Sequence, residues 1–185
     1  MKLKIQVLTD AKLREFIDYL EQIPYSAYQK NVVLDEKDVF SFSYIPNNKY
    51  IIAVDKEEAD EDKEKGKIIG HICIISPYTK YGYHQEHILE VHINIIPEYQ
   101  SKGVGKELLV FFLQEVKKGR KNNGIKKIKT KMLASNEPAI KLFEKTGFKK
   151  EALLKKEWKM IIEDEKTGKK KEIYEDCLYM SLGLE

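Results

Sequence analysis

The feature that most constrains the fold is the stretch His87–Val116, in which a strand pattern changes into a helix pattern. Within 88–95 every second position is apolar, which predicts a strand with one buried face. Pro97 has no N–H to donate to a β-ladder, so it ends the strand. After a short polar turn, apolar residues recur every four positions, at Val104, Leu108, Phe112 and Val116. This spacing predicts a helix, so the stretch is expected to form a strand, a tight turn and a helix.

The turn between this strand and helix contains glycine and lysine, in the order Gln100-Ser101-Lys102-Gly103-Val104-Gly105-Lys106. The first N–H groups of a helix have no partner within the helix, and the helix dipole places about half a positive charge there. Glycine lets the backbone approach a ligand closely. Lys102 and Lys106 add formal charge, so the turn is suited to an anion such as a pyrophosphate. An ordinary loop with two glycines is the plain alternative.

Three phosphate-binding patterns have glycines in a turn of this kind. The dinucleotide fingerprint requires a glycine where this chain has Leu108, and the P-loop requires Ser or Thr where it has Glu107. A third pattern, Gln/Arg-x-x-Gly-x-Gly/Ala after a strand, is satisfied by Gln100, Gly103 and Gly105. The segment therefore resembles the acetyl-CoA signature of the GNAT N-acetyltransferase superfamily.

A second segment, Asn136–Phe148, is similar to another motif of that superfamily, Asn-x-x-Ala followed by Tyr-x-x-x-Gly-Phe. It follows a predicted strand, as the family order requires. The chain departs from the motif at Phe143, where family members often place a tyrosine that protonates the departing CoA sulfur. Phenylalanine cannot do this, so the identity of the general acid is open.

The resemblance implies an α/β fold with a mixed, mostly antiparallel central sheet of six or seven strands flanked by helices. A splayed pair of parallel strands, Ile88–Ile96 and Ile125–Leu133, would form the acetyl-CoA cleft. The length suits one domain over residues 1–185. Alternation predicts further strands at Lys2–Leu8, Lys49–Val54, Lys67–Ser76, Phe148–Ile162 and Lys171–Leu182.

Two helix ends are predicted from individual residues. Thr9 or Asp10 is expected to cap a helix that contains Leu13, Phe16, Ile17 and Leu20. Gly119 and Gly124 bracket a basic turn, and Gly119 is expected to end the helix that follows the glycine-rich turn.

Acetyl-CoA is the cosubstrate that the resemblance implies, and no metal-ligand spacing stands out among the four histidines. The N–H of Ile95 or its neighbour would bond the thioester carbonyl, and Asn136 would bond the pantetheine unless it only caps a helix. The expected cofactor-binding residues are Ile95, Ile96, Gln100, Ser101, Lys102, Gly103, Val104, Gly105, Lys106, Asn136 and Phe143.

Catalysis requires the acceptor amine to lose a proton. By resemblance Glu90 is the first candidate base, and His92 is the second because free imidazole titrates nearer neutrality. The plain alternative is that Glu90 and His92 are surface residues of a solvent-facing strand and have no role in catalysis. Tyr179, Tyr174 or a water could protonate the sulfur, although a thiol with a pKa of about 8.5 can also leave as thiolate. No Ser, Cys and His arrangement indicates an acyl-enzyme, so direct attack in a ternary complex is expected.

The leading hypothesis is an N-acetyltransferase that acts on a primary amine, with a protein N-terminus, a polyamine or a small amine metabolite as the acceptor. The alternative is a non-catalytic acyl-CoA-binding sensor of the same fold, a hypothesis to which Phe143 gives weight. The acceptor is expected to be selected by 24–48 and 77–86. The charge run 55–66 is expected to be a solvated loop. The alternative is that its acidic residues attract a cationic substrate.

Composition limits the other function classes. A net charge of +3, with acidic residues interleaved throughout, is too weak to favour a nucleic-acid partner. No apolar run is long enough to span a membrane, and the N-terminus lacks the pattern of a secretory signal. Cys73 and Cys177 both lie in strand-like runs and are expected to be core residues. A cytoplasmic location is therefore expected, and a homodimer formed through the C-terminal strands is a hypothesis.

Overall fold

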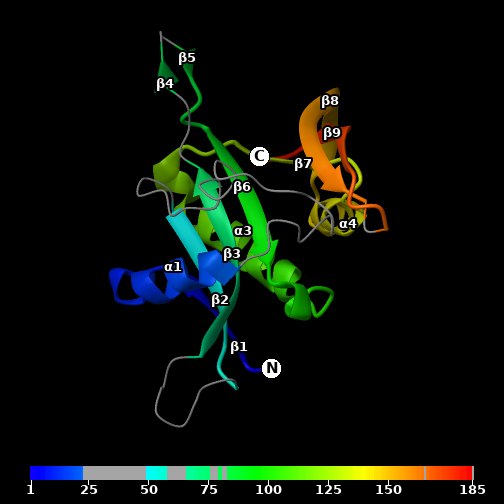
Figure 1. Ribbon diagram of the computed structural model, residues 1–185. Helices are drawn as coiled ribbons and strands as arrows, with labels where there is room; N and C mark the ends of the chain where they lie inside the picture. The colour runs from blue at the N-terminus through cyan, green and yellow to red at the C-terminus, as the bar shows by residue number, and fades with distance from the viewer. Residues whose placement is uncertain (23–48, 58–65, 76–78, 81–82, 165, 185) are drawn as a thin grey trace.

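The computed structural model describes residues 1–22, 49–57, 66–75, 79–80, 83–164 and 166–184 (Figure 1). Its centre is a seven-stranded sheet in the order β1-β2-β3-β6-β7-β9-β8. The strands are β1 (Leu3–Val7), β2 (Lys49–Asp55), β3 (Lys67–Ile75), β6 (Ile88–Ile95), β7 (Lys127–Leu133), β8 (Lys149–Glu163) and β9 (Lys170–Gly183). Among these described strands, only β6 and β7 pair in parallel, and the other neighbours are antiparallel. The predicted mixed, mostly antiparallel sheet is thus confirmed.

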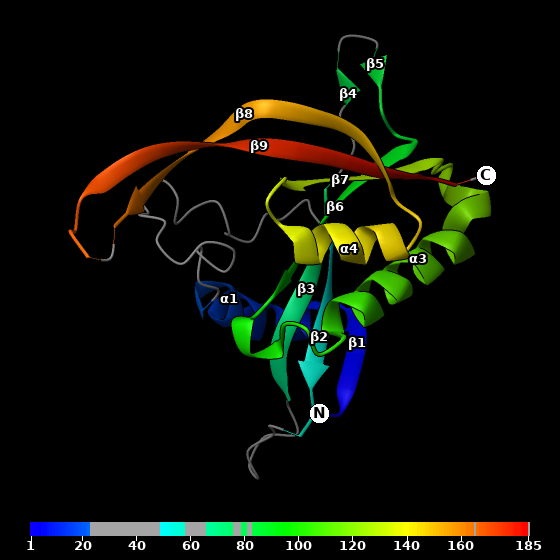
Figure 2. The same cartoon turned by 90° about the vertical axis from the view of Figure 1, so that its right-hand side faces the viewer.

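The helices cover both faces of this sheet. They are α1 (Leu13–Gln22), α3 (Val104–Asn123) and α4 (Glu137–Lys145), with 3₁₀ turns at η1 (Asp10–Lys12) and η3 (Pro97–Tyr99), and a two-residue pair forms β4 (Thr79–Lys80) and β5 (Tyr83–His84). In the views of Figures 1 and 2, α1 lies on one side of the central strands and α3 on the other. Within the described residues, no helix is both long and apolar enough to cross a membrane.

The core has two parts, one on each face of the sheet. On the α1 side, the fully buried ring of Phe16 packs against Tyr50, with ring centroids 4.9 Å apart. On the α3 side, Leu108, Leu109 and Phe112 are almost wholly shielded from solvent. Leu108 and Phe112 belong to the four-residue spacing that predicted this helix, and Leu109 lies beside them. They attach α3 firmly to the strands that carry the glycine-rich turn.

Both helix ends that were predicted from single residues are wrong. Helix α3 continues through Gly119 to Asn123, and Gly124, at φ 65°, takes the left-handed conformation that ends it. A glycine inside a helix costs only about 1 kcal/mol, and the packing of a long helix outweighs that cost. At the other site Thr9 precedes the 3₁₀ turn Asp10–Lys12 that leads into α1, but its side chain makes no capping bond, and Asp10 lies within that turn.

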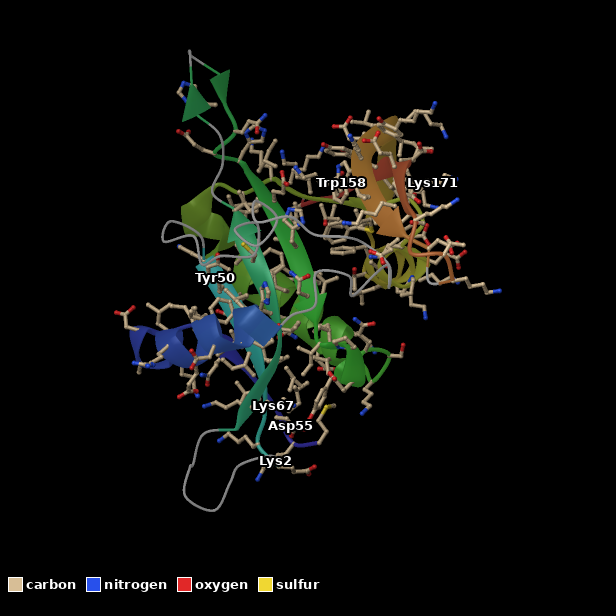
Figure 3. All side chains as sticks on the ribbon, viewed as in Figure 1. Lys2, Tyr50, Asp55, Lys67, Trp158 and Lys171 are labelled. Atoms are coloured by element: carbon tan, nitrogen blue, oxygen red, sulfur yellow. The ribbon has the colours of Figure 1, made fainter. Side chains whose placement is uncertain are left out.

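The last two strands form a long hairpin that leaves the sheet. β9 pairs with β7 only between Cys177 and Gly183, and beyond that its only neighbour among the described residues is β8. We call this outer part, 155–163 with 170–176, the arm. Figure 2 shows it arching to the side of the sheet on which α1 lies, and Trp158 and Lys171 mark it in Figure 3.

Some predicted acceptor segments lie outside the described residues. This holds for all of 24–48, for 58–65 of the charge run, and for 77–78 and 81–82. The site is therefore built below from the strands, the glycine-rich turn and α4.

Candidate active site

The parallel strands β6 and β7 pair only at their beginnings. The register runs from Ile88↔Lys127 to Glu90↔Lys129 and then stops. Beyond this point β6 stays paired with β3, and β7 stays paired with β9. The two strands therefore separate while remaining in one sheet. This confirms the splayed pair expected from the sequence, and we call the space between their outer ends the gap.

The hydrogen-bond register shows which backbone groups face the gap. The N–H of Ile96 donates to the carbonyl of Ile69 on β3, at 3.0 Å. Pairs in an antiparallel ladder alternate between bonded and non-bonded, so the odd-numbered residues of β6 direct their N–H groups away from β3. Ile95 is one of these residues, and no β7 residue pairs with it. The neighbouring Ile96 already uses its N–H in the bond to β3, so Ile95 stays the candidate donor to a thioester.

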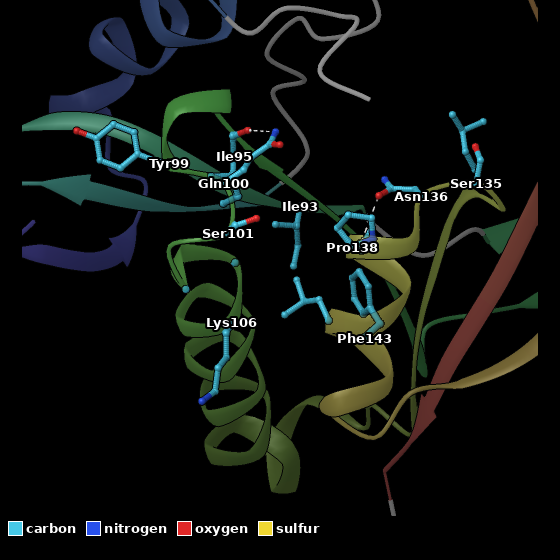
Figure 4. A pocket seen from close by; sticks show the side chains of 15 residues that line it. Ile93, Ile95, Tyr99, Gln100, Ser101, Lys106, Ser135, Asn136, Pro138 and Phe143 are labelled. Carbon is cyan, nitrogen blue, oxygen red and sulfur yellow. Dashed lines mark hydrogen bonds between the residues drawn. The ribbon is translucent and has the colours of Figure 1, made fainter. Parts of the chain in front are cut away.

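A pocket of about 420 Å³ opens beside the gap on the helix side (Figure 4). Its walls come from β6, from the turn after Pro97, from the start of α3 and from α4. Predicted cofactor residues that line it are Ile95, Gln100, Ser101, Gly103, Gly105, Lys106, Asn136 and Phe143. Apolar walls are added by Ile93, Leu133, Pro138, Ala139 and Leu142. The two sequence motifs, more than thirty positions apart, thus meet on one cavity.

The glycine-rich turn is held in a conformation that directs N–H groups outward. The Gln100 side chain donates from Nε2 to the carbonyl of Ile95 at 3.0 Å and ties the turn to the strand end (Figure 4). Ser101 and Gly103 both have positive φ, at 59° and 88°. Left-handed residues within such a turn gather N–H groups into an anion-binding concavity. The N–H of Glu107 bonds to Gly103, so the N–H groups that precede it lie before the first helical bond.

Three predicted cofactor residues do not place their side chains in the pocket. Val104 and Ile96 are buried in the core, at 1% and 7% exposed. The exposed Lys102 ammonium instead lies over the ring of Tyr99, 5.1 Å from its centroid. For Val104 and Ile96, only backbone groups remain as candidates for cofactor contact, and the N–H of Ile96 is already used.

Tyr99 lines the pocket and was missed in the sequence. Its hydroxyl donates to Oδ2 of the buried Asp55 at 3.2 Å. Burial alone would raise the pKa of Asp55, but hydrogen bonds from the N–H groups of Glu57 and Lys2 and from Tyr99 outweigh it and lower the pKa. No local sequence pattern could predict this contact, because Asp55 lies at the end of β2, far from Tyr99 in the chain.

The α4 wall combines a helix cap with a packed aromatic pair. Asn136 accepts from the N–H of Ala139 at 3.3 Å, so it does cap α4, as the plain alternative held. Phe143 is 3% exposed and packs edge-on against Phe148, with centroids 4.9 Å apart. At this point the pocket is therefore bounded by an aromatic ring that carries no hydroxyl.

The opposite face of the same strands is charged. One Glu90 oxygen lies 3.1 Å from Nε2 of His92 and 3.4 Å from Nζ of Lys131, and the other lies 3.1 Å from Nζ of Lys129. The hydrogen bond from His92 is the largest influence on the pKa of Glu90. Burial opposes it, but the two lysines add to it, and the pKa falls to about 2. Glu90 is therefore ionised at neutral pH and has little affinity for a proton.

A buried histidine that the sequence did not single out lies on the same face of the sheet as this cluster. His71 is 3% exposed, with Nδ1 3.1 Å from the Tyr19 hydroxyl and Nε2 3.4 Å from Nδ2 of Asn94. Burial, with a smaller contribution from the charge of His92, lowers the pKa of His71 to about 3. His71 is thus neutral at physiological pH. The available signal was one imidazole within the apolar run of β3.

The candidate general acids lie away from the helix-side pocket. Tyr179 stands opposite Lys131 in the β7–β9 ladder, so its side chain shares the face of Glu90. Tyr174 pairs only with Lys159 on the arm and is 53% exposed, which removes it as a candidate acid. Within the described residues, His, Cys, Asp and Glu form no group of three or more that could hold a metal ion.

Residues 14–148 match the Acetyltransferase (GNAT) family. The chain belongs to this family. The match covers both motifs and the whole pocket wall, and it confirms both the resemblance and the class of acyltransferase. A curated relative, the SPbeta prophage-derived uncharacterized N-acetyltransferase YokL of Bacillus subtilis, is 29% identical over 121 residues, which are 65% of this chain. The matched region spans about half of that relative, 54% of its length.

Solved structures of other GNAT proteins share the fold. A phosphinothricin acetyltransferase from Sinorhizobium meliloti, solved in complex with acetyl-CoA, has a TM-score of 0.66 and 20% identity. That comparison covers 100% of this chain and 89% of the other. A GNAT-family acetyltransferase from Streptococcus pneumoniae has a TM-score of 0.64 and 17% identity, over 99% of this chain and 100% of the other. At these identities the likeness concerns the fold.

Proposed function

We propose that this chain transfers an acetyl group from acetyl-CoA to a primary amine by direct attack in a ternary complex. The gap between β6 and β7 is the observation that carries the proposal. The pocket lies beside it on the helix side, and the charges around Glu90 lie on the other face of the same strands. A coenzyme bound on one face can therefore present its acyl group to an amine that arrives from the other.

The coenzyme would lie along the walls already described. Its diphosphate would accept from the N–H groups of the turn at Gly103 and Gly105, where the helix dipole favours negative charge. The pantetheine would run past Ile93 toward α4, where the Asn136 amide nitrogen can donate to it. The N–H of Ile95 would donate to the thioester carbonyl and bond more strongly as negative charge develops on that oxygen.

We assign the base to His92 and a positioning role to Glu90, which reverses the order given by resemblance. An amine with a pKa of about 10.4 must lose its proton before it attacks. Glu90 is a poor acceptor for that proton because its pKa is about 2. As a carboxylate it accepts a hydrogen bond from Nε2 of His92, so its negative charge would stabilise a proton that the ring takes up at Nδ1.

The departing sulfur presents a separate question, because Phe143 has no proton to give. Tyr179 stays our candidate acid, since it lies on the charged face next to Lys131. A thiolate can also leave unaided, because a thiol has a pKa of about 8.5. Tyr179→Phe distinguishes these routes. A loss of turnover that grows as the pH falls supports protonation by a donor, and an unchanged rate supports the free thiolate.

The test of the function combines binding with turnover. Calorimetry with acetyl-CoA should show one site per chain, and acetyl-CoA with a panel of amines should release CoA thiol and form acetylated products visible by mass spectrometry. His92→Gln should lower kcat about a hundredfold and leave acetyl-CoA affinity nearly unchanged. Binding of acetyl-CoA without any product would favour the non-catalytic acyl-CoA sensor. An absence of binding would contradict both the enzyme and the sensor.

Three broader predictions accompany the function. We propose that residues 1–185 form one domain, that the protein works in the cytoplasm, and that two copies associate through the C-terminal strands. Light scattering of the purified chain tests the last of these. A mass of one chain at micromolar concentration would contradict the dimer.

A further inference from the structure

Strand β7 carries lysines at alternate positions, Lys127, Lys129 and Lys131. Alternate residues of a strand share one face, and pairing of Lys129 with Glu90 identifies this as the charged face. Lys127 is neutralised separately, because its Nζ lies 2.6 Å from Glu151 on β8. The other two lysines share the single carboxylate of Glu90. This small cluster therefore holds one cation more than it holds anions.

The excess charge is accessible. Lys129 and Lys131 are 29% and 37% exposed, whereas Glu90 between them is only 15% exposed. An ammonium has three donors, and each lysine directs one interaction to Glu90. A second carboxylate could thus bind both lysines without displacing Glu90. A cationic ligand would meet net repulsion at the same place.

The cluster is also in the right position to act on an acceptor. Lys129 belongs to the last residue pair before β6 and β7 separate, and Lys131 has no partner on β6 at all. Lys131 therefore borders the gap through which an amine would reach the thioester. Two residues of strand span about 7 Å, a separation that lysine side chains can bridge.

We propose that Lys129 and Lys131 bind a carboxylate of the acceptor, so that the substrate is a small amine with a carboxylate close to its amino group. This inference rests on the proposed function and narrows it. Polyamines are disfavoured, because they bring only positive charge to the cluster. An amine with a neutral amide in place of the carboxylate would lose the ion pairs.

Matched substrates test the inference. Free amino acids are compared with their amides, glycine with glycinamide and β-alanine with its amide, and with putrescine and spermidine. The carboxylates should be acetylated with a kcat/KM about tenfold above the amides, equivalent to about 1.4 kcal/mol. Lys131→Gln should remove that preference by raising KM with little change in kcat, because the anchor binds ground state and transition state alike.

The chain offers a matched control and a reversal. Lys127→Gln removes a lysine from the same face but at the closed end of the strand pair, and it should keep the preference. Lys131→Glu should shift the preference toward putrescine. Amides or polyamines that react as well as carboxylates in the wild type, or a preference that survives both Lys129→Gln and Lys131→Gln, would overturn the inference. Failure of every amine to release CoA would instead defeat the proposed function itself.

Discussion

The two faces of the β6–β7 pair are built from alternate residues of the same strands yet differ in kind. Between the strands and α4 the helix-side pocket is apolar and shaped by close contact, with Ile93 and Ile95 on one wall and Leu142 and Phe143 on the other. The opposite face is a network of charges around Glu90. The first should therefore respond to changes in volume and the second to changes in charge. Variants that affect one face without the other can test how far the two are independent.

The largest effect is expected from filling the pocket. A Cβ added at Gly105 would lie 3.1 Å from Cδ2 of Leu142, so Gly105→Val would press α3 against α4 and occupy the cavity. Calorimetry should show acetyl-CoA binding weakened about a hundredfold, or roughly 2.7 kcal/mol. Overpacking should cost about 1–3 kcal/mol of unfolding free energy.

The double variant Gly105→Val with Leu142→Ala serves as the control. It restores space and should recover part of the affinity, which a purely destabilised protein would not do. A folded Gly105→Val protein that binds acetyl-CoA normally would show that the coenzyme does not use this pocket.

A smaller effect is expected on the charged face from lowering the pH. The pKa of His71 is about 3 in the folded chain, whereas a free imidazole has a pKa of 6.5, so the unfolded chain binds the proton first. Stability is therefore full above pH 6.5 and falls as the pH drops toward 3, by up to about 1.4 kcal/mol per pH unit. Between pH 6.5 and pH 5 the loss should be about 2 kcal/mol by urea unfolding.

His71→Gln cannot titrate, so its stability should change less over the same interval, whatever its absolute value. Protonation of Glu90 does not contribute to the stability change between pH 6.5 and pH 5. Its pKa falls from 4.5 to about 2, so its contribution is lost only below pH 4.5. Parallel slopes for the wild type and His71→Gln between pH 6.5 and 5 would rule out burial of a neutral His71.

The smallest effect tests whether the pocket depends on the far end of β2. Tyr99→Phe keeps the ring that lines the pocket and removes the bond to Asp55, whose other acceptor contacts, to Lys2 and Glu57, remain. Thermal unfolding should show a loss of about 1 kcal/mol. Tyr174→Phe, which changes an exposed tyrosine on the arm, should have almost no effect. A large rise in the KM for acetyl-CoA in Tyr99→Phe would show that the hydroxyl positions the turn.

The sequence predicted the helix-side part of the site but not the contacts on the charged face. The turn at Gln100 and the cap at Asn136 are local patterns, so the pocket they build was predicted together with the sheet and its gap. The pairing of Glu90 with Lys129 and Lys131 depends on strand register, which no short window of sequence contains. His71 and Tyr19 meet only because β3 packs against α1. The prediction that Gly119 ends the helix was wrong because glycine is able, but not required, to leave the helical conformation. In this chain Gly119 stays helical and Gly124 takes the positive φ.

The bulge in β8 bears on how this protein behaves at high concentration. Within the described residues β8 ends the sheet, and such an open edge invites strands from other molecules. Between Leu154 and Trp158 its register breaks, and Lys156 adopts a φ of 53° while its N–H bonds to Asp176. A second chain cannot pair along an interrupted edge as one continuous ladder, so an association of two copies through the C-terminal strands would have to use side-chain contacts or a short stretch of strand. The long hairpin is thereby protected against joining its neighbours into fibres.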